Sequence, residues 1–278
     1  MIFNSYIFIL FFAIVFGLYW FVFNSNVKTQ NLVVLTASYF FYSYADWRFS
    51  FLLFGITILN YFLGIYIDKA TQPTTRKILL YIGLIQGIGG LAFFKYYNFF
   101  VTSIVDAFAL LSVSVSLKTL EIIVPLGISF FTFRTLSYLL DVEKGKIKPI
   151  TDWIVFFTYV SFFPSLLSGP IDKARTFIPQ LEKLRVFDYN QASDGMRQIL
   201  WGFFKKIVVA NNCAPITNEI FANYETLPAS SLFLGALLYT FQIYADFSGY
   251  SDMAIGFSKL LGFTITKNFD YPFSLITL

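Results

Sequence analysis

The sequence predicts an all-α fold, a polytopic bundle of transmembrane helices with additional re-entrant and interfacial helices. Hydrophobic residues make up 57% of the 278 residues and charged residues only 13%, against about 25% charged in soluble domains. The mean hydropathy is +0.67, and several apolar stretches approach the roughly 20 residues that cross a bilayer. The 37 Phe, 18 Tyr and 4 Trp suit lipid-facing surfaces and interfacial aromatic belts.

The apolar stretches fall into two groups along the chain. Those near the length of a membrane span are residues 2–23, 49–67, 78–100 and 120–140. Those that are shorter or interrupted by polar residues are 31–44, 153–167, 196–210 and 231–256. The first stretch has no basic segment before it and no small-residue cleavage site after it, so we expect a retained span and not a signal peptide.

The basic residues predict the topology. By the positive-inside rule, the three basic loops should be cytoplasmic, which puts the N-terminus and residues 101–118 outside. These loops carry Lys28, then Lys69, Arg76 and Lys77, then Lys144, Lys146 and Lys148. We expect a multi-pass protein of the bacterial inner membrane, with the lipid bilayer as its main partner.

Three segments in the middle of the chain do not have the pattern of membrane spans. Residues 153–167 are too few to cross, contain Pro164 and have basic stretches on both sides, which predicts a re-entrant segment. Residues 177–197 are the most polar stretch, and we expect an interfacial helix there. Residues 196–210 place Lys205 and Lys206 among apolar side chains, which favours a lipid-anchoring helix with snorkelling lysines.

These elements form one membrane domain, residues 1–278, with three regions. Residues 1–140 hold the N-terminal spans, and residues 141–212 form a re-entrant and interfacial region on the cytoplasmic side. Residues 213–278 are predicted to be a broken-helix segment that lines a cavity.

Composition excludes several classes of function. The net charge is only +4 and the basic residues lie in short clusters between apolar runs, so we expect no nucleic-acid partner. The single cysteine, Cys213, excludes an intramolecular disulfide and multi-cysteine metal motifs, and we expect no metal site. The chain contains no histidine, which removes histidine-based triads, zinc sites and proton relays.

Arg134 is a candidate functional residue because it lies midway along the fourth long apolar stretch. Pro125 and Gly127 precede it and can break the span. A mid-span arginine is rarely lipid-facing. It either holds an anionic group, such as the phosphate of an acyl donor, or pairs with Asp246 or Asp141 to fix the bundle, and we favour the structural pair.

A second candidate region is the Ser-Gly-Pro turn that runs from Ser168 to Pro170. Asp172, Lys173 and Arg175 follow it directly. This strong chain break either shapes the cytosolic mouth of a cavity or only turns the chain.

The densest polar set lies in residues 239–263. A carboxylate at the bilayer centre costs about 2.5 to 3.5 kcal/mol, so Asp246 and Asp252 should face protein or a water-filled cavity. Asp246 and Ser248 point in different directions on an unbroken helix, so we expect a helix break at Ser248 and Gly249 that frees both carboxylates to line a cavity. The alternative is a polar interhelical network without chemistry. The cavity-lining candidates of this segment are Gln242, Tyr244, Asp246, Ser248, Gly249, Tyr250, Ser251 and Asp252.

An ordered series of motifs resembles the membrane-bound O-acyltransferase family, in particular its branch similar to alginate O-acetyltransferases. The series is PLGISFFTFRTLSYLLDVEKGK, FFPSLLSGPID, WGFFKKIVVANN, YTFQIYADFSGYSDMAIGFSKLLGF and NFDYPF. More distantly, it is similar to the membrane protein that hands D-alanine onward in teichoic-acid modification. The resemblance implies a multi-helix funnel that passes an acyl group, typically acetyl, from a cytosolic donor to an exported polysaccharide.

The resemblance also implies a catalytic histidine after an Asn-Phe-x-x-Pro-aromatic segment. Its counterpart here contains Asn268, Phe269, Pro272 and Phe273, and the chain stops at Leu278 without a histidine. We therefore expect no catalytic residue and no catalysis in this chain alone, and we count Asn268 among the cavity-lining candidates. The implied substrate is acetyl-CoA or an acyl-carrier thioester with no bound cofactor, and polysaccharide-acetylation proteins are the implied partners.

Two alternatives remain open at this point. The chain is half of a split acyltransferase that a second chain completes, or it is a transporter or ion pathway that uses Asp246, Asp252 and Arg134.

Overall fold

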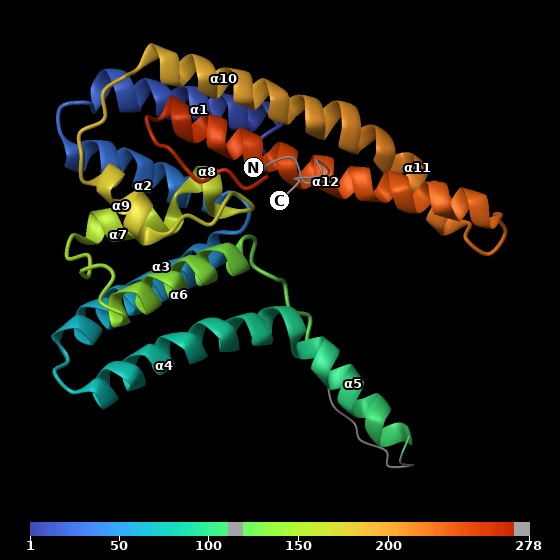
Figure 1. Ribbon diagram of the computed structural model, residues 1–278, viewed down its shortest axis with the longest axis horizontal. Coiled ribbons are helices and arrows are strands. Elements are labelled where there is room, and N and C mark those ends of the chain that lie inside the picture. The colour runs from blue at the N-terminus through green and yellow to red at the C-terminus, as the bar shows by residue number, and fades with distance from the viewer. Residues whose placement is uncertain (111–118, 270–278) are drawn as a thin grey trace, which may run out of the picture.

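The computed structural model describes residues 1–110 and 119–269, and the regular structure in these ranges is entirely helical (Figure 1). The α-helices are α1 (Tyr6–Gly17), α2 (Val27–Ser43), α3 (Trp47–Lys69), α4 (Pro73–Leu91), α5 (Tyr97–Leu110), α6 (Ile128–Glu143), α7 (Trp153–Ser161), α8 (Phe163–Leu166), α9 (Ala174–Leu181), α10 (Tyr189–Phe203), α11 (Asn211–Ala222) and α12 (Ala229–Leu260). The π-helical segments are η1 (Leu18–Val22), η2 (Ala92–Tyr96) and η3 (Phe204–Ala210). The all-α prediction is confirmed.

Short polar side chains decide where several helices begin. The first turn of a helix has N–H groups with no partner inside the helix, and a preceding Ser, Asn or Asp oxygen accepts from them. Such caps start α1, α2, α3, α7 and α10, and they are Ser5, Asn26, Asp46, Asp152 and Asp188.

The helices pack in three layers (Figure 1). The middle layer contains α2, α7, α8 and α9, with α3, α4 and α6 on one side and α1, α10 and α12 on the other. Buried aromatic rings join the middle layer to α1 and α12: the centroid of Phe8 lies 5.9 Å from Phe41, 6.4 Å from Phe163 and 4.9 Å from Phe257. This aromatic core fixes α12 against the body of the protein.

Two helical stretches are long and apolar enough to cross a membrane, Trp47–Lys69 and Pro73–Phe108. Only 33% and 17% of their most apolar windows is buried inside the protein, so most of this apolar surface faces outward. A bilayer tolerates such a surface, whereas a core helix of a soluble protein is mostly buried. Helix Tyr6–Val22 is a shorter apolar stretch.

The fourth long apolar stretch is shortened, as its sequence suggested. Residues 120–127 are not helical, and α6 begins only at Ile128. Gly127 adopts φ +71, and a Cβ there would lie 2.5 Å from the carbonyl oxygen of Leu166, so only glycine fits. The chain break predicted at Pro125 and Gly127 is therefore confirmed, and it packs against the end of α8.

Residues 153–167 form two short helices that meet at Phe162, and residues 155–166 are all buried. The break leaves a backbone N–H on Phe163, which donates to the Ser38 hydroxyl at 3.1 Å. A short, broken and fully protein-covered segment is what the re-entrant interpretation requires.

The largest departure from expectation is α12. It runs unbroken from Ala229 to Leu260, so the helix break expected at Ser248 and Gly249, and with it the broken-helix description of residues 213–278, is wrong. The helix lies antiparallel to the run of α10, η3 and α11, and the pair extends beyond the body of the protein (Figure 1).

Glycines explain why this helix pair packs so closely. A Cβ on Gly249 would lie 2.8 Å from the carbonyl oxygen of Gly202, and a Cβ on Gly256 would lie 2.5 Å from that of Gly195. The glycines repeat at the same seven-residue interval on both helices, which lets the backbones touch. Gly249 thus serves helix packing and not chain breaking.

Candidate functional site

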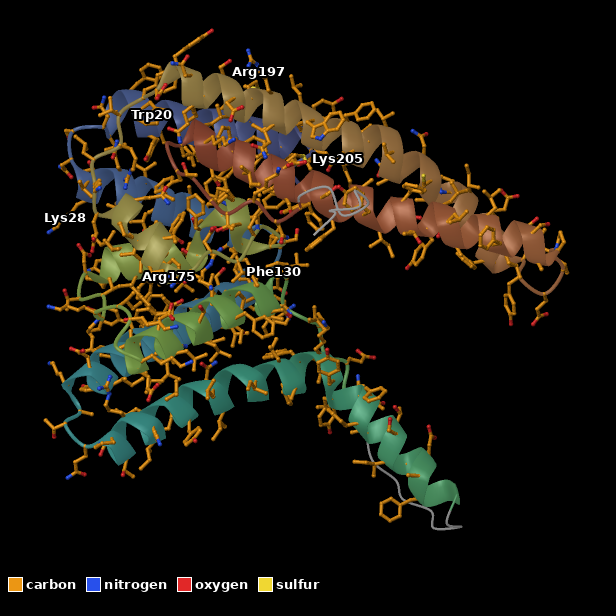
Figure 2. All side chains as sticks on the ribbon, viewed as in Figure 1. Trp20, Lys28, Phe130, Arg175, Arg197 and Lys205 are labelled. Carbon is orange, nitrogen blue, oxygen red and sulfur yellow. The ribbon has the colours of Figure 1, made fainter. Side chains whose placement is uncertain are left out.

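A row of charged and amide side chains runs along the interface of α10 and η3 with α12. We call it the polar row, and it consists of Asp194, Gln198, Lys205, Lys206, Asp246, Asp252 and Lys259. It lies beside the glycine contacts, where the close approach of the two backbones brings long side chains within reach of each other. Figure 2 shows Arg197 and Lys205 on this helix pair.

The centre of the polar row is an ion pair between Lys205 and Asp252, with Nζ 2.6 Å from Oδ2. The other carboxylate oxygen of Asp252 accepts from Nε2 of Gln198 at 3.1 Å. The two charged side chains are only 16% and 14% exposed, so the pair is largely removed from solvent. Lys205 Nζ also lies 5.6 Å from the centre of the Trp201 ring. A charge-assisted contact with additional hydrogen bonds is the arrangement in which a buried ion pair is stable.

The row continues towards the end of α12. Lys259 Nζ lies 2.5 Å from Asp194 Oδ2 and donates to Gln198 Oε1 at 2.7 Å. Gln198 therefore bridges the two ion pairs, accepting from Lys259 through its oxygen and donating to Asp252 through its nitrogen. The five groups, from Lys205 through Asp252, Gln198 and Lys259 to Asp194, form a continuous hydrogen-bonded chain in which each member orients the next.

At the other end, Lys206 pairs with Asp246. The Asp246 side chain is 50% exposed, so it is more accessible than that of Asp252, the other carboxylate that α12 contributes to the polar row. Further along α12, Thr217 of α11 donates its hydroxyl to Gln242 Oε1 at 2.6 Å. Polar contacts thus follow this face of α12 from Gln242 to Lys259.

The π-helical segment η3 carries both lysines that reach α12. A π segment inserts an extra residue per turn and recurs at functional sites. The interpretation of residues 196–210 as a lipid anchor with snorkelling lysines is wrong for Lys205 and Lys206, because both pair with carboxylates of the neighbouring helix.

Three hydroxyls on the same helix remain without hydrogen-bond partners. Ser248, Tyr250 and Ser251 are buried or half-buried, and none has a partner within hydrogen-bonding geometry. The Tyr250 ring stacks on Phe3 at 4.4 Å, and its hydroxyl faces Ser168 of the Ser-Gly-Pro turn. Tyr250 and Ser168, two candidates 82 residues apart, therefore lie close together, and the hydroxyls of Ser248 and Ser251 are available for hydrogen bonds from a polar ligand.

The favoured interpretation required Arg134 to pair with Asp141 or Asp246, and the structure shows neither pair. Its guanidinium is 2% exposed and donates to the carbonyl oxygens of Tyr159 and Val160 at 3.0 and 3.3 Å, and to the Ser165 hydroxyl at 2.6 Å. These acceptors lie at the broken end of the α7–α8 segment, where carbonyls lose their helical partners. Arg134 is a structural residue that holds the break.

Asp172 links this break to the chain beyond α12. It is 2% exposed, and its Oδ1 accepts from the backbone N–H and the hydroxyl of Thr266, both at 2.8 Å. Burial raises the pKa of the Asp172 carboxyl above its ordinary value, while the charge of Arg134 and the hydrogen bonds from Thr266 act in the opposite direction. The segment after α12 is thereby fixed across the Ser-Gly-Pro turn.

The remaining candidate residues lie in different surroundings. Pro170 is buried, and Tyr244 stacks edge-on against Phe269 at 5.8 Å, so the segment after α12 folds back along that helix. Asn268 is exposed, which does not support its expected place in a cavity lining. Pro272 and Phe273 lie outside the described residues.

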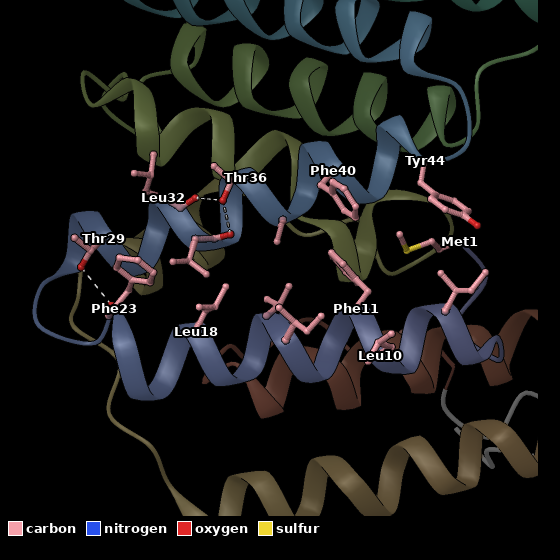
Figure 3. Close-up of a pocket in the computed structure, with 15 residues that line it drawn as sticks. Met1, Leu10, Phe11, Leu18, Phe23, Thr29, Leu32, Thr36, Phe40 and Tyr44 are labelled. Carbon is pink, nitrogen blue, oxygen red and sulfur yellow. Dashed lines mark hydrogen bonds between the residues drawn. The ribbon is translucent and has the colours of Figure 1, made fainter.

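An apolar groove lies apart from all of these groups. It has a volume of about 620 Å³ between α1 and α2, and Figure 3 shows Phe11, Leu32 and Phe40 among its lining. The lining is almost entirely apolar, and its titratable groups are the Tyr44 hydroxyl and the N-terminal amino group of Met1. This groove can accept hydrocarbon but offers no group for acyl-transfer chemistry.

The fold and the polar row define an all-α membrane protein with ion pairs between neighbouring helices. The chain is similar over nearly its whole length to membrane acyltransferases. It is 37% identical to a probable alginate O-acetylase AlgI of Pseudomonas syringae pv. tomato over 98% of this chain and 52% of that protein. It is 31% identical to a peptidoglycan O-acetyltransferase of Helicobacter pylori over 100% of this chain and 57% of that protein.

A teichoic acid D-alanyltransferase of Lacticaseibacillus rhamnosus is more distant, at 27% identity over 55% of this chain and 40% of that protein. No family model matches the chain. The chain belongs to the membrane-bound O-acyltransferase family, and it spans about half the length of the curated relatives it matches.

Sequence reasoning missed Asp194 and Gln198 on α10, and it missed that Lys205 pairs with Asp252. A usable signal was present. Glycines at 195 and 202 and at 249 and 256 share one interval, which predicts a close antiparallel helix pair. Aligning these glycines puts Gln198 next to the position opposite Asp252 and puts Lys205 opposite Asp246, so the pairing of Lys205 with Asp252 is a finding of the structure alone.

Proposed function

We propose that the chain forms the acyl-transfer core of a membrane O-acetyltransferase that modifies an exported polysaccharide. The observation that carries this proposal is the similarity to alginate and peptidoglycan O-acetyltransferases across 98% to 100% of the chain. The polar row supports it, because charged groups in a membrane bundle are costly and mark substrate pathways.

The reaction is the transfer of an acetyl group from a thioester to a hydroxyl. The donor is acetyl-CoA or an acyl-carrier thioester on the face of the basic loops, and the acceptor lies on the opposite side of the membrane. The acceptor oxygen attacks the carbonyl carbon, the C–S bond breaks, and the hydroxyl proton passes to the departing thiolate, which leaves as the thiol.

The residues of the chain would act by placing the reactants. The paired charges of the polar row would lie along one side of the substrate path, and the hydroxyls of Ser248, Tyr250 and Ser251 would offer hydrogen bonds to the polar ends of a substrate. The 278 residues contain no histidine, so an imidazole general base would come from a segment outside them or from a second chain. We propose that these 278 residues do not catalyse transfer by themselves.

We also propose that the protein is a multi-pass protein of the cytoplasmic membrane of a bacterium. Two described stretches have the length and hydropathy of spans, and the basic loops favour one face as cytoplasmic. Polysaccharide-acetylation proteins would be its partners in the envelope.

The direct test is to delete the coding sequence in its native host and to measure ester-linked acetate in the exported polysaccharide and in the peptidoglycan. We expect one of these glycans to lose its base-labile acetate, and a plasmid copy to restore it. The glycan that changes identifies the acceptor. Unchanged acetate in every envelope glycan would refute the proposed function.

A further inference from the structure

A second, polar cleft lies away from the polar row, on the face that carries the basic loops. It has a volume of about 430 Å³ and lies between the loop that joins α6 to α7 and helix α9. We propose that this cleft binds the phosphate group of an amphipathic ligand. The ligand is either a phosphate-bearing thioester donor of the coenzyme A type or an anionic phospholipid.

The charge of the cleft carries the proposal. Its lining includes the cations Lys146, Lys148 and Arg175, and Figure 2 shows Arg175, which belongs to α9. All three are exposed, and none of them takes part in an ion pair between described residues. Three cations without a counter-ion around one concave site attract a multiply charged anion, and arginine in particular matches the geometry of phosphate.

Neither carboxylate of the lining, Asp152 or Glu182, forms an ion pair with these three cations, which outnumber them. Asp152 is occupied as the N-cap of α7, where its Oδ1 accepts from the N–H of Ile154 at 2.9 Å. Glu182 is the other carboxylate of the lining, and it is exposed. Exposed lysines at 144, 173 and 183 lie on the same two chain segments and add positive potential around the mouth.

The walls of the cleft are held in place, which distinguishes it from a loose surface loop. The backbone N–H of Ile150 donates to the Tyr138 hydroxyl at 3.2 Å, and the Tyr61 hydroxyl donates to the carbonyl oxygen of Thr151 at 2.5 Å. Both contacts tie the loop to helices α6 and α3. A fixed loop loses little conformational entropy when a ligand binds.

The floor of the cleft is apolar. Ile150, Ala174 and Ile178 are buried side chains of the lining, so the cleft joins a cationic rim to an apolar base. Helix α9 begins at this floor, and Lys173 before it provides no side-chain cap for the first N–H groups. A phosphate at the rim with an apolar group below it fits both halves, and inorganic phosphate would use only the rim.

The test compares two charge-matched variants of the purified chain in lipid nanodiscs. The first combines Lys146→Ala, Lys148→Ala and Arg175→Ala. The control combines Lys28→Ala, Lys69→Ala and Lys77→Ala, which removes the same charge from the other basic loops. All of these side chains are exposed, so both variants should fold, and thermal unfolding checks that they do.

The probes are coenzyme A, pantetheine as its phosphate-free counterpart, and phosphatidylcholine nanodiscs with or without phosphatidylglycerol. If a soluble donor is the ligand, coenzyme A binds the unaltered chain and the control, and the cleft variant binds it at least about tenfold more weakly. If a lipid is the ligand, coenzyme A does not bind, and retention of phosphatidylglycerol falls by about tenfold in the cleft variant alone.

Three results would overturn the proposal. The first is an equal loss of ligand binding in the cleft variant and the control, and the second is an unaltered chain that retains neither coenzyme A nor phosphatidylglycerol. The third is pantetheine binding as tight as that of coenzyme A together with equal retention of phosphatidylglycerol by both variants. Because binding is measured without turnover, failure of this proposal leaves the proposed acyl transfer untouched, and the reverse also holds.

Discussion

The ion pair of Lys205 and Asp252 makes the sharpest prediction about stability. The perturbation is Asp252→Asn, which removes the charge and keeps the size of the side chain. Lys205 would then remain as an uncompensated cation that is only 16% exposed. Breaking a fully buried pair costs about 3 to 5 kcal/mol. The rings of Trp201 and Tyr244 stay 5.6 and 6.0 Å from the ammonium, so we expect a smaller loss of about 2 to 3 kcal/mol.

The assay is reversible unfolding of the purified chain in mixed detergent micelles, followed by circular dichroism at increasing fractions of dodecyl sulfate. A double-mutant cycle with Lys205→Met isolates the pair from the individual side chains. The double variant should be less destabilised than the sum of the single variants by about 1.5 to 3 kcal/mol, because it leaves no unpaired charge.

Asp246→Asn is the matched control, since it breaks the second pair on the same helix. The Asp246 side chain is 50% exposed, so we expect a loss below about 1 kcal/mol. Additive effects of Lys205→Met and Asp252→Asn, or equal losses for Asp252→Asn and Asp246→Asn, would refute the reasoning that burial makes the central pair important.

Three further predictions concern the backbone and the buried groups. Gly202→Ala should destabilise the chain by about 1 to 3 kcal/mol in the same assay, because its Cβ would lie 2.6 Å from the Gly249 carbonyl oxygen. Gly89→Ala should instead stabilise it by about 0.5 to 1 kcal/mol, because no atom lies within 4 Å; a loss for both would contradict the packing argument. Gly127→Ala should cost more than about 1 kcal/mol, since φ +71 and the Leu166 carbonyl both oppose a side chain, and a neutral result would show that α6 begins without this turn. Because burial raises the pKa of Asp172, the folded chain binds this proton more tightly than the unfolded chain does. The group therefore stabilises the fold below pH 3.8, and this contribution is lost as pH rises through the raised pKa. Asp172→Asn should therefore weaken the decline of stability over that range in a pH series of unfolding curves, and an unchanged decline would rule out Asp172 as its source.

Much of the fold follows from local properties of the sequence. The all-α class rests on the apolar stretches, and the breaks at Pro125 and Gly127 and at Phe162 follow from residue types that cannot continue a helix. The short segment 153–167 was recognisable by its length alone. These features need no knowledge of which helices are neighbours.

The candidate site was predictable only in part. The sequence predicted that Asp246 and Asp252 need covering, because the cost of a lipid-exposed carboxylate does not depend on the fold, and both carboxylates pair with lysines of η3 although Asp246 stays 50% exposed. It failed on Gly249, where the same residue type serves a helix break or a close helix contact. It also failed on Arg134, whose acceptors are backbone carbonyls that a sequence does not display.

The sequence by itself thus determined the polar content of residues 239–263 and the requirement that these groups be covered. Only the tertiary structure decided how they are covered: an unbroken helix lies against a second helix through paired glycines, and Lys205 and Lys206 supply the counter-charges. The reason is physical. Transfer from water into an apolar medium is a property of each residue, whereas an ion pair depends on a distance between two segments, and that distance exists only when the chain has folded.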